Sequence, residues 1–339
     1  MEYADTPTQA ETSRYAAYSE VGPARTVIRL GRRPIPRPGP GQVLVEIHRS
    51  GINPSDTKRR AGWASYKPHT PPMILHTDGA GIIVEVGDGV SGSRIGERVW
   101  LWNAETDGQG TASDHCVVGA DHAVPLPQPA SFDVGACLGV PACTAHRAVF
   151  ADGPVEGQSV LVHGGAGAVG AYAIQFALRG GAKVIATGSS AEKRQAALDL
   201  GAHRAVDYRD PDAARLILDA NGGRGVDRII EVDLGQNLHL DLAVVSTNAT
   251  IASYSSTRVR EFSFPYYQIA PKGLNFRIVQ GYCLPDRARR EGVADINAAL
   301  SQGWLKHRIG AVFPFEQIID AHEAAERGGA IGKVLVALR

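Results

Sequence analysis

One stretch, residues 159–179, constrains the fold of this chain more than any other. It reads Ser159-Val-Leu-Val-His-Gly-Gly-Ala-Gly-Ala-Val-Gly170, followed by Ala171-Tyr-Ala-Ile-Gln-Phe-Ala-Leu-Arg179. An apolar run typical of a buried strand enters a glycine-rich turn, and apolar residues at helical spacing follow at once. The stretch therefore predicts a strand, a phosphate-binding turn and a helix.

The glycines of this turn fit the pattern G-x-G-x-x-G. In that pattern the first glycine allows a tight turn, the second lets the backbone approach a pyrophosphate, and the third lets the helix pack on the strand. The helix N-terminus then directs free N–H groups and its positive dipole end at the phosphates. A plain turn is the alternative, but the flanking strand and helix favour a dinucleotide. We expect the dinucleotide to be bound by Gly165, Gly167, Ala168, Val169 and Gly170.

Length and charge narrow the classes of function. A chain of 339 residues is long enough for two domains with buried cores. Lys+Arg and Asp+Glu both number 35, so there is no net charge and no basic surface for nucleic acid or an anionic membrane. The four cysteines form no C-x-x-C pair, and no apolar run is long enough to span a bilayer. We expect a soluble, cytoplasmic protein with a small-molecule partner.

The sequence pattern changes near residue 131. Residues 14–130 contain short β-type runs bounded by Gly and Pro, which indicate a barrel-like β domain. Strands and helices alternate over residues 131–273, which predicts a parallel sheet with crossover helices. Residues 274–280 form one more expected strand, and the segments up to 339, including a helix over 287–301, are expected to return to the first domain. Residues 1–13 are polar and are expected to be a disordered arm.

These features resemble the medium-chain dehydrogenase/reductase superfamily, and within it the zinc-free, zeta-crystallin-like quinone oxidoreductase branch. Besides the glycine turn, four passages carry the likeness: Ser50-Gly-Ile-Asn-Pro-Ser-Asp-Thr57, His76-Thr-Asp-Gly-Ala-Gly-Ile-Ile-Val-Glu-Val-Gly87, Leu138-Gly-Val-Pro-Ala-Cys-Thr-Ala145 and Gly332-Lys-Val-Leu-Val336. The resemblance implies an α/β fold in which a Rossmann doubly wound parallel sheet is inserted in a GroES-like, β-rich substrate domain. It also implies an oxidoreductase in which a nicotinamide cofactor meets a small-molecule acceptor.

The resemblance raises the question of a metal. A catalytic zinc needs three protein ligands of Cys, His or carboxylate type. Where zinc-dependent relatives carry these ligands, this chain has Asn53, Thr77-Asp78 and Val140, and the four-cysteine structural zinc lobe is absent. A second group of candidate ligands matches no known spacing: His76, His115, His122 and Cys116. We expect no bound metal, and alcohol oxidation is disfavoured because nothing evident stabilises an alkoxide.

The end of the second Rossmann strand indicates which nicotinamide cofactor is used. NAD enzymes place an acidic residue there for the ribose 2′-OH, whereas a 2′-phosphate needs cations. This strand ends Thr187-Gly-Ser-Ser190 without a carboxylate, and Lys193-Arg194 follow. Resemblance adds Tyr208, which relatives pair with the lysine around the phosphate. We expect NADPH, held by Thr187, Ser189, Lys193 and Tyr208, although Ser189 with Glu192 also fits a helix capping box.

Four further residues are candidates for contact with the nicotinamide or the acceptor. Asn53 is expected to hydrogen-bond one of them, the alternative being a turn residue before a proline. Lys58 stands where several relatives have a tyrosine, so it is either the proton donor or a surface lysine. Thr144 is expected to pack at the nicotinamide, and Tyr254 either lines the pocket or belongs to the core.

The expected function is that of a zinc-independent, NADPH-dependent oxidoreductase that transfers hydride to a quinone. Reduction of an α,β-unsaturated carbonyl such as an enone, alkenal or acrylate is the alternative within the same class. A nucleotide-binding structural protein with little turnover is the alternative from another class. The strand 274–280 is expected to pair with its twin in a homodimer, as in the family, because an exposed edge strand is otherwise an aggregation hazard.

Overall fold

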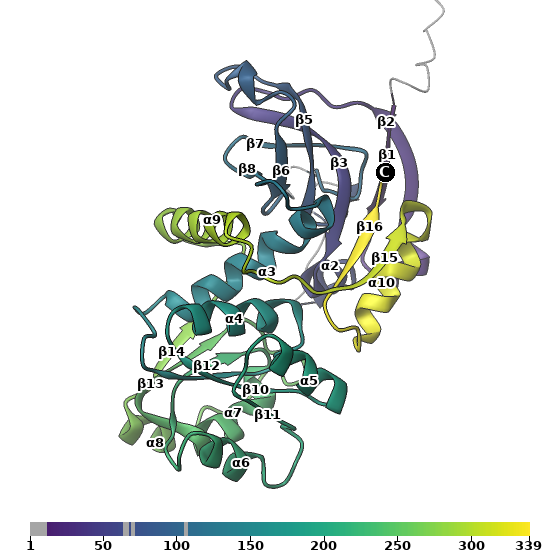
Figure 1. Cartoon of the computed structure of the whole chain (residues 1–339). Helices are drawn as coiled ribbons and strands as arrows, with labels where there is room; N and C mark the ends of the chain where they lie inside the picture. Colours follow the sequence, from purple (N-terminus) through teal and green to yellow (C-terminus); the bar gives the residue numbers. More distant parts are fainter. Residues whose placement is uncertain (1–11, 64–67, 69–71, 105–107) are drawn as a thin grey trace, which may run out of the picture. The chain divides into compact units, whose positions relative to one another are not determined.

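The computed structural model describes residues 12–63, 68, 72–104 and 108–339 (Figure 1). The chain forms two compact units. The first unit comprises residues 1–140 and 309–339, and the second comprises residues 141–308. The boundary therefore falls at Val140–Pro141 and not at residue 131. Of the expected N-terminal arm, only Thr12 and Ser13 lie within the described residues, and they belong to the first strand.

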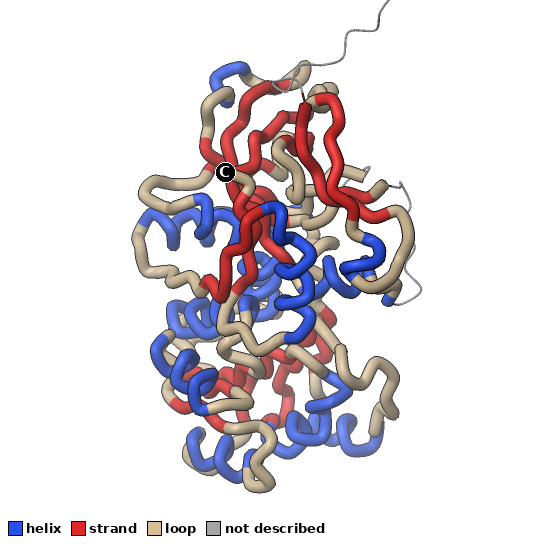
Figure 2. The backbone as a smooth tube through the Cα atoms, turned by 90° about the vertical axis from the view of Figure 1, so that its right-hand side faces the viewer, coloured by secondary structure: helices blue, strands red, loops and turns tan. Residues whose placement is uncertain are grey.

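The first unit is built mainly from strands (Figure 2). Its helices and strands are β1 (Thr12–Tyr18), α1 (Ala24–Val27), β2 (Arg29–Pro34), β3 (Gln42–Ile52), α2 (Pro54–Arg60), β4 (Met73–Ile74), β5 (Asp78–Val86), β6 (Arg98–Leu101), β7 (His115–Gly119), β8 (Ala123–Pro125), β15 (Ile309–Pro314), α10 (Ile318–Arg327) and β16 (Lys333–Ala337). A seven-stranded sheet runs β15-β16-β3-β5-β6-β8, with β7 paired to β3, and a three-stranded sheet runs β2-β1-β4. Because β16 pairs antiparallel with β3, the C-terminal segment completes the larger sheet.

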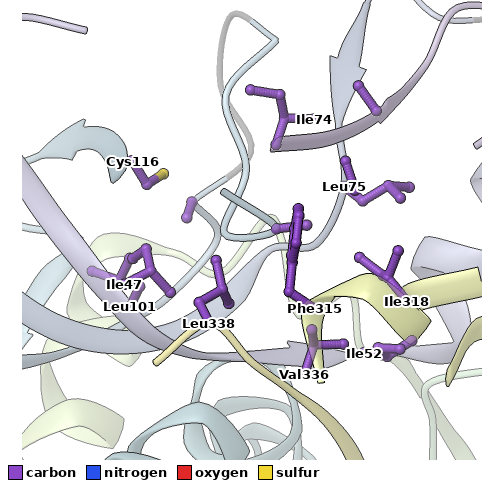
Figure 3. Close-up of a cluster of buried hydrophobic side chains, with 14 of the residues drawn as sticks. Ile47, Ile52, Ile74, Leu75, Leu101, Cys116, Phe315, Ile318, Val336 and Leu338 are labelled. Carbon is purple, nitrogen blue, oxygen red and sulfur yellow. The ribbon is translucent and has the colours of Figure 1, made fainter. Parts of the chain in front are cut away.

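The core of the first unit joins the two ends of the chain. Val43, Val45 and Ile47 alternate along β3, so they lie on one face of the sheet, and none of the three is exposed. They share one apolar cluster with Phe315 and Leu338, and Figure 3 shows Leu338 beside Ile47. Burying apolar surface contributes about 25 cal/mol per Å². The N-terminal strands and the C-terminal segment therefore stabilise each other.

The second unit alternates strands with helices. Its elements are α3 (Phe132–Phe150, which begins in the first unit), β9 (Ser159–Val162), α4 (Ala168–Arg179), β10 (Lys183–Thr187), α5 (Ala191–Asp199), β11 (Arg204–Val206), α6 (Ala213–Ala220), β12 (Val226–Glu231), α7 (Leu234–Val244), β13 (Val245–Ser253), α8 (Tyr266–Ile269), β14 (Asn275–Ile278) and α9 (Asp286–Ser301). The six strands form a parallel sheet in the order β11-β10-β9-β12-β13-β14. The order reverses beside β9, and ligands of doubly wound sheets bind at such a switch point.

Helix α9 differs from the expectation for the C-terminal region. It belongs to the second unit, and the chain returns to the first unit only at Ile309. His146 of α3 contacts α9 through a 2.8 Å bond from Nε2 to the Asp295 carboxylate, and Ile296 is fully buried. The apolar spacing of residues 287–301 indicates a helix with one buried face, but it does not indicate which unit covers that face.

The cysteines are all free thiols. Cys116, Cys137 and Cys143 are buried, and Cys283 is exposed. Burial raises the pKa of the Cys116 and Cys137 thiols to about 12, so both remain protonated at neutral pH. Within the described ranges, no helix combines the length and apolar character that crossing a membrane requires.

Candidate active site

The glycine turn follows β9, at the switch point of the parallel sheet. Its left-handed residue is Gly164, with φ of +66°, and not Gly165. A Cβ at Gly165 would lie 3.0 Å from the Ala186 Cβ of β10, so this position is restricted by packing against the sheet. A Cβ at Gly170 would overlap the Gly164 carbonyl oxygen, so only glycine lets α4 pack this closely on the turn.

The start of α4 has the form of an anion site. Gly167 precedes the helix as its N-cap, and a Cβ there would meet only the Gly164 carbonyl oxygen, at 3.3 Å. Ala168 and Val169 begin the helix, where backbone N–H groups have no intrahelical acceptor. These N–H groups and the helix dipole suit the pyrophosphate of a dinucleotide.

The end of β10 supports the glycine turn. The Thr187 hydroxyl lies 3.1 Å from Nδ1 of His163 and accepts a hydrogen bond from the Gly164 N–H at 3.3 Å. The N-cap of α5 is Ser190, whose hydroxyl accepts from the Lys193 N–H at 3.2 Å. The alternative interpretation of Ser189 as the helix cap is therefore wrong. The cap is the next residue, Ser190.

Three cationic side chains surround the loop between β10 and α5. Besides Lys193, they are Arg194, which donates to the Gly188 carbonyl at 3.2 Å, and Arg209, which donates to the Ser189 carbonyl. Both arginines also bind the Asp207 carboxylate; hydrogen bonds from Arg209 are the main cause that holds the Asp207 pKa well below its usual range. One carboxylate thus binds two of the three cations. Sequence reasoning missed Arg209, although it directly follows Tyr208.

Three buried ionisable side chains meet where β9 enters the turn. His163 Nε2 lies 2.9 Å from Asp241 Oδ1 and 3.6 Å from Glu231 Oε2, and none of the three side chains is more than 1% exposed. Burial alone lowers the pKa of His163, but the two carboxylates outweigh this effect and raise it to about 9. Burial also raises the pKa of Glu231. His163 is therefore a cation at neutral pH, and its Nε2–H donates a hydrogen bond to Asp241 Oδ1.

Two further residues of the second unit were expected at the cofactor. Thr144 on α3 is 3% exposed, and its hydroxyl has no hydrogen-bond partner within the described part of the chain. A buried hydroxyl without a partner is costly, so it is available to a bound polar group. Tyr254 follows β13 and is half-buried, and burial, with the nearby Glu231 carboxylate, raises its phenol pKa.

A second polar group lies in the first unit, around Asn53. This residue precedes α2, and its N–H donates to Asp56 Oδ2 at 2.7 Å. Its side-chain Nδ2 donates to Asp78 Oδ2 at 2.8 Å and to Thr77 Oγ1 at 3.3 Å. Lys333 Nζ donates to Asn53 Oδ1 at 2.9 Å and pairs with Asp78. Burial raises the pKa of the Asp78 carboxyl, against the opposing effect of the Lys333 charge.

Lys333 is the member of this group that sequence reasoning missed. In the sequence it stands within the run Gly332-Lys-Val-Leu-Val336, next to apolar residues. A charged residue opening an apolar strand is the signal that was available. The other candidate, Lys58, lies on α2 with Nζ 5.1 Å from the centre of the Trp63 ring, which is a cation–π contact.

The chain matches two protein families along its length. Residues 39–128 match the alcohol dehydrogenase GroES-like domain, and residues 168–296 match the zinc-binding dehydrogenase family. The quinone oxidoreductases of Rattus norvegicus and Homo sapiens are each 33% identical to it, over 306 and 307 residues, which cover 90% of this chain and 91% of theirs. The chain belongs to the medium-chain dehydrogenase/reductase superfamily, in its quinone oxidoreductase branch.

Solved structures place this oxidoreductase in the same fold. A mycobacterial quinone oxidoreductase superposes with a TM-score of 0.82 at 25% identity, over 96% of this chain and 99% of its own. A structure described as an NAD-dependent alcohol dehydrogenase gives 0.86 at 25% identity, over 96% and 100% of the two chains. The chain is an enzyme of the oxidoreductase class that binds a nicotinamide cofactor and acts on a small-molecule acceptor.

The residues at the zinc-ligand positions do not fit zinc. The Asn53 amide nitrogen, the Val140 N–H and the Lys333 ammonium all donate hydrogen toward Asp78, whereas zinc requires lone pairs. The Asp78 carboxylate, the one common zinc-ligand type in this set, is already paired with the ammonium.

Two of the other candidate ligands, His76 and His122, have partners of their own. His76 binds the Ser50 hydroxyl at 2.8 Å and His322 at 2.9 Å, and Nδ1 of His122 lies 3.3 Å from the Asn103 carbonyl oxygen. In the described residues, the one trio of His, Cys or acidic side chains close enough to share an ion is His163, Glu231 and Asp241. The positive charge on protonated His163 explains why the two carboxylates lie this close to it.

The charge on His163 predicts a loss of stability at alkaline pH. Because its pKa is raised in the folded state, its contribution is complete below the ordinary value of about 6.5 and is lost as the pH rises through about 9. We expect the free energy of unfolding to fall by the order of 3 kcal/mol across this window. Denaturant unfolding at several pH values measures it. The triple variant His163→Gln, Glu231→Gln and Asp241→Asn removes all three titrating groups and should lack most of this slope; an unchanged slope would contradict the assignment.

Proposed function

We propose that this enzyme is an NADPH-dependent, zinc-independent reductase of quinones. The observation that carries the proposal is the Lys333–Asp78–Asn53 group: it offers hydrogen-bond donors, and no metal site, at the positions where zinc-dependent relatives bind their ion. The likeness to quinone oxidoreductases over nine-tenths of the chain supports it.

The preference for NADPH rests on the loop after β10. A 2′-phosphate carries close to two negative charges, and Lys193, Arg194 and Arg209 surround the loop where it would bind. Asp207 lies nearby, but two arginines already bind it. An acidic residue that holds a ribose 2′-OH in NAD enzymes is normally free to accept that bond. Ser189, Lys193 and Tyr208 remain our proposed contacts, now joined by Arg209.

The proposed acceptor follows from the chemistry of negative charge. The cofactor, when bound, supplies a hydride, and the acceptor takes this hydride and a proton to become the reduced product. A quinone spreads the developing charge over its ring and a second oxygen. An enal concentrates it on one enolate oxygen and also needs a proton on carbon. A site that offers hydrogen bonds without a metal therefore favours the quinone.

We further propose a homodimer formed through β14. This strand is the edge of the six-stranded sheet, and Ile278 at its end is 69% exposed. Phe264, Tyr266 and Tyr267 lie before it in the chain and are exposed as well. An apolar, unpaired edge of this kind is typical of a protein–protein contact.

The cofactor preference predicts a selective effect of Lys193→Ala and Arg209→Ala. Charge-assisted contacts contribute about 1.5–3 kcal/mol each, so each change should raise KM for NADPH roughly tenfold or more and leave that for NADH little changed. Initial rates with both cofactors measure this. Arg287→Ala removes an exposed cation on α9 and serves as the control. Equal use of NADPH and NADH by the unaltered enzyme would contradict the preference.

The acceptor preference predicts faster turnover of small ortho- and para-quinones than of simple enals or acrylates, with little alcohol oxidation. Steady-state oxidation of NADPH against a panel of acceptors measures it. The expected difference is about 10²-fold, because an enal depends more on each aligned donor. Rapid turnover of enals together with inactivity toward every quinone would replace this function by alkene reduction.

The edge strand predicts a dimer that a single charge disrupts. Ile278→Glu places a carboxylate on the apolar edge, so sedimentation should show a dimer for the unaltered chain and a monomer of about half that mass for the variant. Ile95→Glu changes a comparably exposed apolar residue in the first unit, 55% exposed, and should leave the dimer intact. A monomeric unaltered chain at micromolar concentration would exclude the dimer.

A further inference from the structure

A buried ammonium group lies where three segments of the first unit meet. Lys333 is the first residue of β16, its side chain is 2% exposed, and its Nζ pairs with the fully buried Asp78 carboxylate. The same Nζ donates to Asn53 Oδ1 at 2.9 Å. This one side chain therefore contacts the start of β5 and the residue before α2 from the C-terminal strand.

The backbone around this ion pair leaves room for it. A Cβ at Gly51 would lie 2.7 Å from Lys333 Cε, and a Cβ at Gly139 would overlap the Asp78 carboxylate. Gly139 also has the non-helical angles φ −14° and ψ −107°, which kink α3. The next N–H, that of Val140, donates to Asp78 Oδ1 at 2.9 Å. Two glycines and a helix kink thus make space for the pair.

Both members of the ion pair orient Asn53. Its Oδ1 accepts from the ammonium, and its Nδ2 donates to Asp78 at 2.8 Å and to Thr77 at 3.3 Å. An amide whose oxygen binds a cation has a more positive nitrogen, so its N–H groups become stronger donors. The bond to Thr77 is the longer one, so its hydrogen is the one that another acceptor displaces most easily.

We propose that Lys333 is a positioning residue for hydride transfer, whose ammonium fixes and polarises the Asn53 amide. The N–H group now shared with Thr77 then hydrogen-bonds the acceptor oxygen as negative charge develops on it. This inference rests on the proposed function, because it requires an acceptor that gains a hydride. The positive charge that zinc supplies in zinc-dependent relatives is supplied here by an ammonium, which the Asp78 carboxylate holds in place.

A double-variant cycle separates this role from a merely structural one. Lys333→Met alone leaves a buried carboxylate unpaired, so its Tm should fall. Lys333→Met with Asp78→Asn removes both charges, so its Tm should recover most of that loss. The proposal expects kcat of the double variant to stay about tenfold or more below the unaltered enzyme, with KM for the acceptor little changed. A double variant with unaltered kcat would overturn it.

A second cycle, of Lys333→Gln with Asn53→Ala, decides the matter if the Lys333→Met variants do not fold. Lys333→Gln keeps a neutral donor beside Asp78. If Lys333 acts through the Asn53 amide, Lys333→Gln should lower kcat about tenfold in the unaltered chain but change it little in the Asn53→Ala background. Equal losses in the two backgrounds would show that Lys333 has no role through Asn53. NADPH titration by fluorescence shows that each variant still binds cofactor.

The choice of acceptor keeps this test distinct from that of the proposed function. All variants are assayed with the acceptor that the unaltered enzyme reduces fastest, whether a quinone or an enal. A preference for enals would end the quinone assignment and leave the Lys333 comparison valid. The last measurement is the activity of the unaltered enzyme after exhaustive removal of metal ions by a chelator. Retained activity is the expected result, whereas stoichiometric zinc whose removal abolishes activity would overturn the role of the ammonium.

Discussion

The first unit depends on the pairing of one buried charge with another. A carboxylate removed from water is costly unless a cation and hydrogen bonds compensate it. Asp78 is fully buried, and its compensation comes from Lys333, which is 255 residues later in the chain. Strand β16 must therefore lie beside β3 with its first residue at this point, and the apolar residues that follow in β16 enter the same core. Together, the ion pair and the apolar core fix the register of β16 against β3.

The second unit applies the same rule at its own ligand-binding end. His163 leaves β9 just before the glycine turn, and two buried carboxylates from β12 and α7 hold its charge. Its other ring nitrogen faces Thr187 at the end of β10. The ends of three neighbouring strands are thus tied to each other beside the turn. A turn that is to bind phosphates through its backbone N–H groups needs fixed positions, because each misaligned donor loses hydrogen-bond energy.

Local pattern explains which parts of this structure were predictable. Strand β10 ends at Thr187, as expected for the second Rossmann strand, and α9 differs by one residue from the expected helix over 287–301, because apolar spacing and turn residues are local signals. The unit to which α9 belongs was not predictable, since any apolar surface can cover an amphipathic helix. Lys333 and Arg209 were missed for a related reason. Each acts on residues from other segments, and a charge next to an apolar run reads as a surface residue until the fold is known.

Replacing a metal by an ammonium changes which reactions a site can assist. A zinc ion accepts a lone pair, so it can bind an alcohol oxygen and stabilise the alkoxide from which a hydride departs. An ammonium, and an amide that it polarises, can only donate hydrogen. On the role proposed for Lys333, the group therefore stabilises an oxygen that gains charge as hydride arrives, but it cannot hold an alkoxide as a metal does. Under the proposed function, this asymmetry connects the residues at positions 53, 78 and 333 to reduction of conjugated acceptors and not to the oxidation of alcohols.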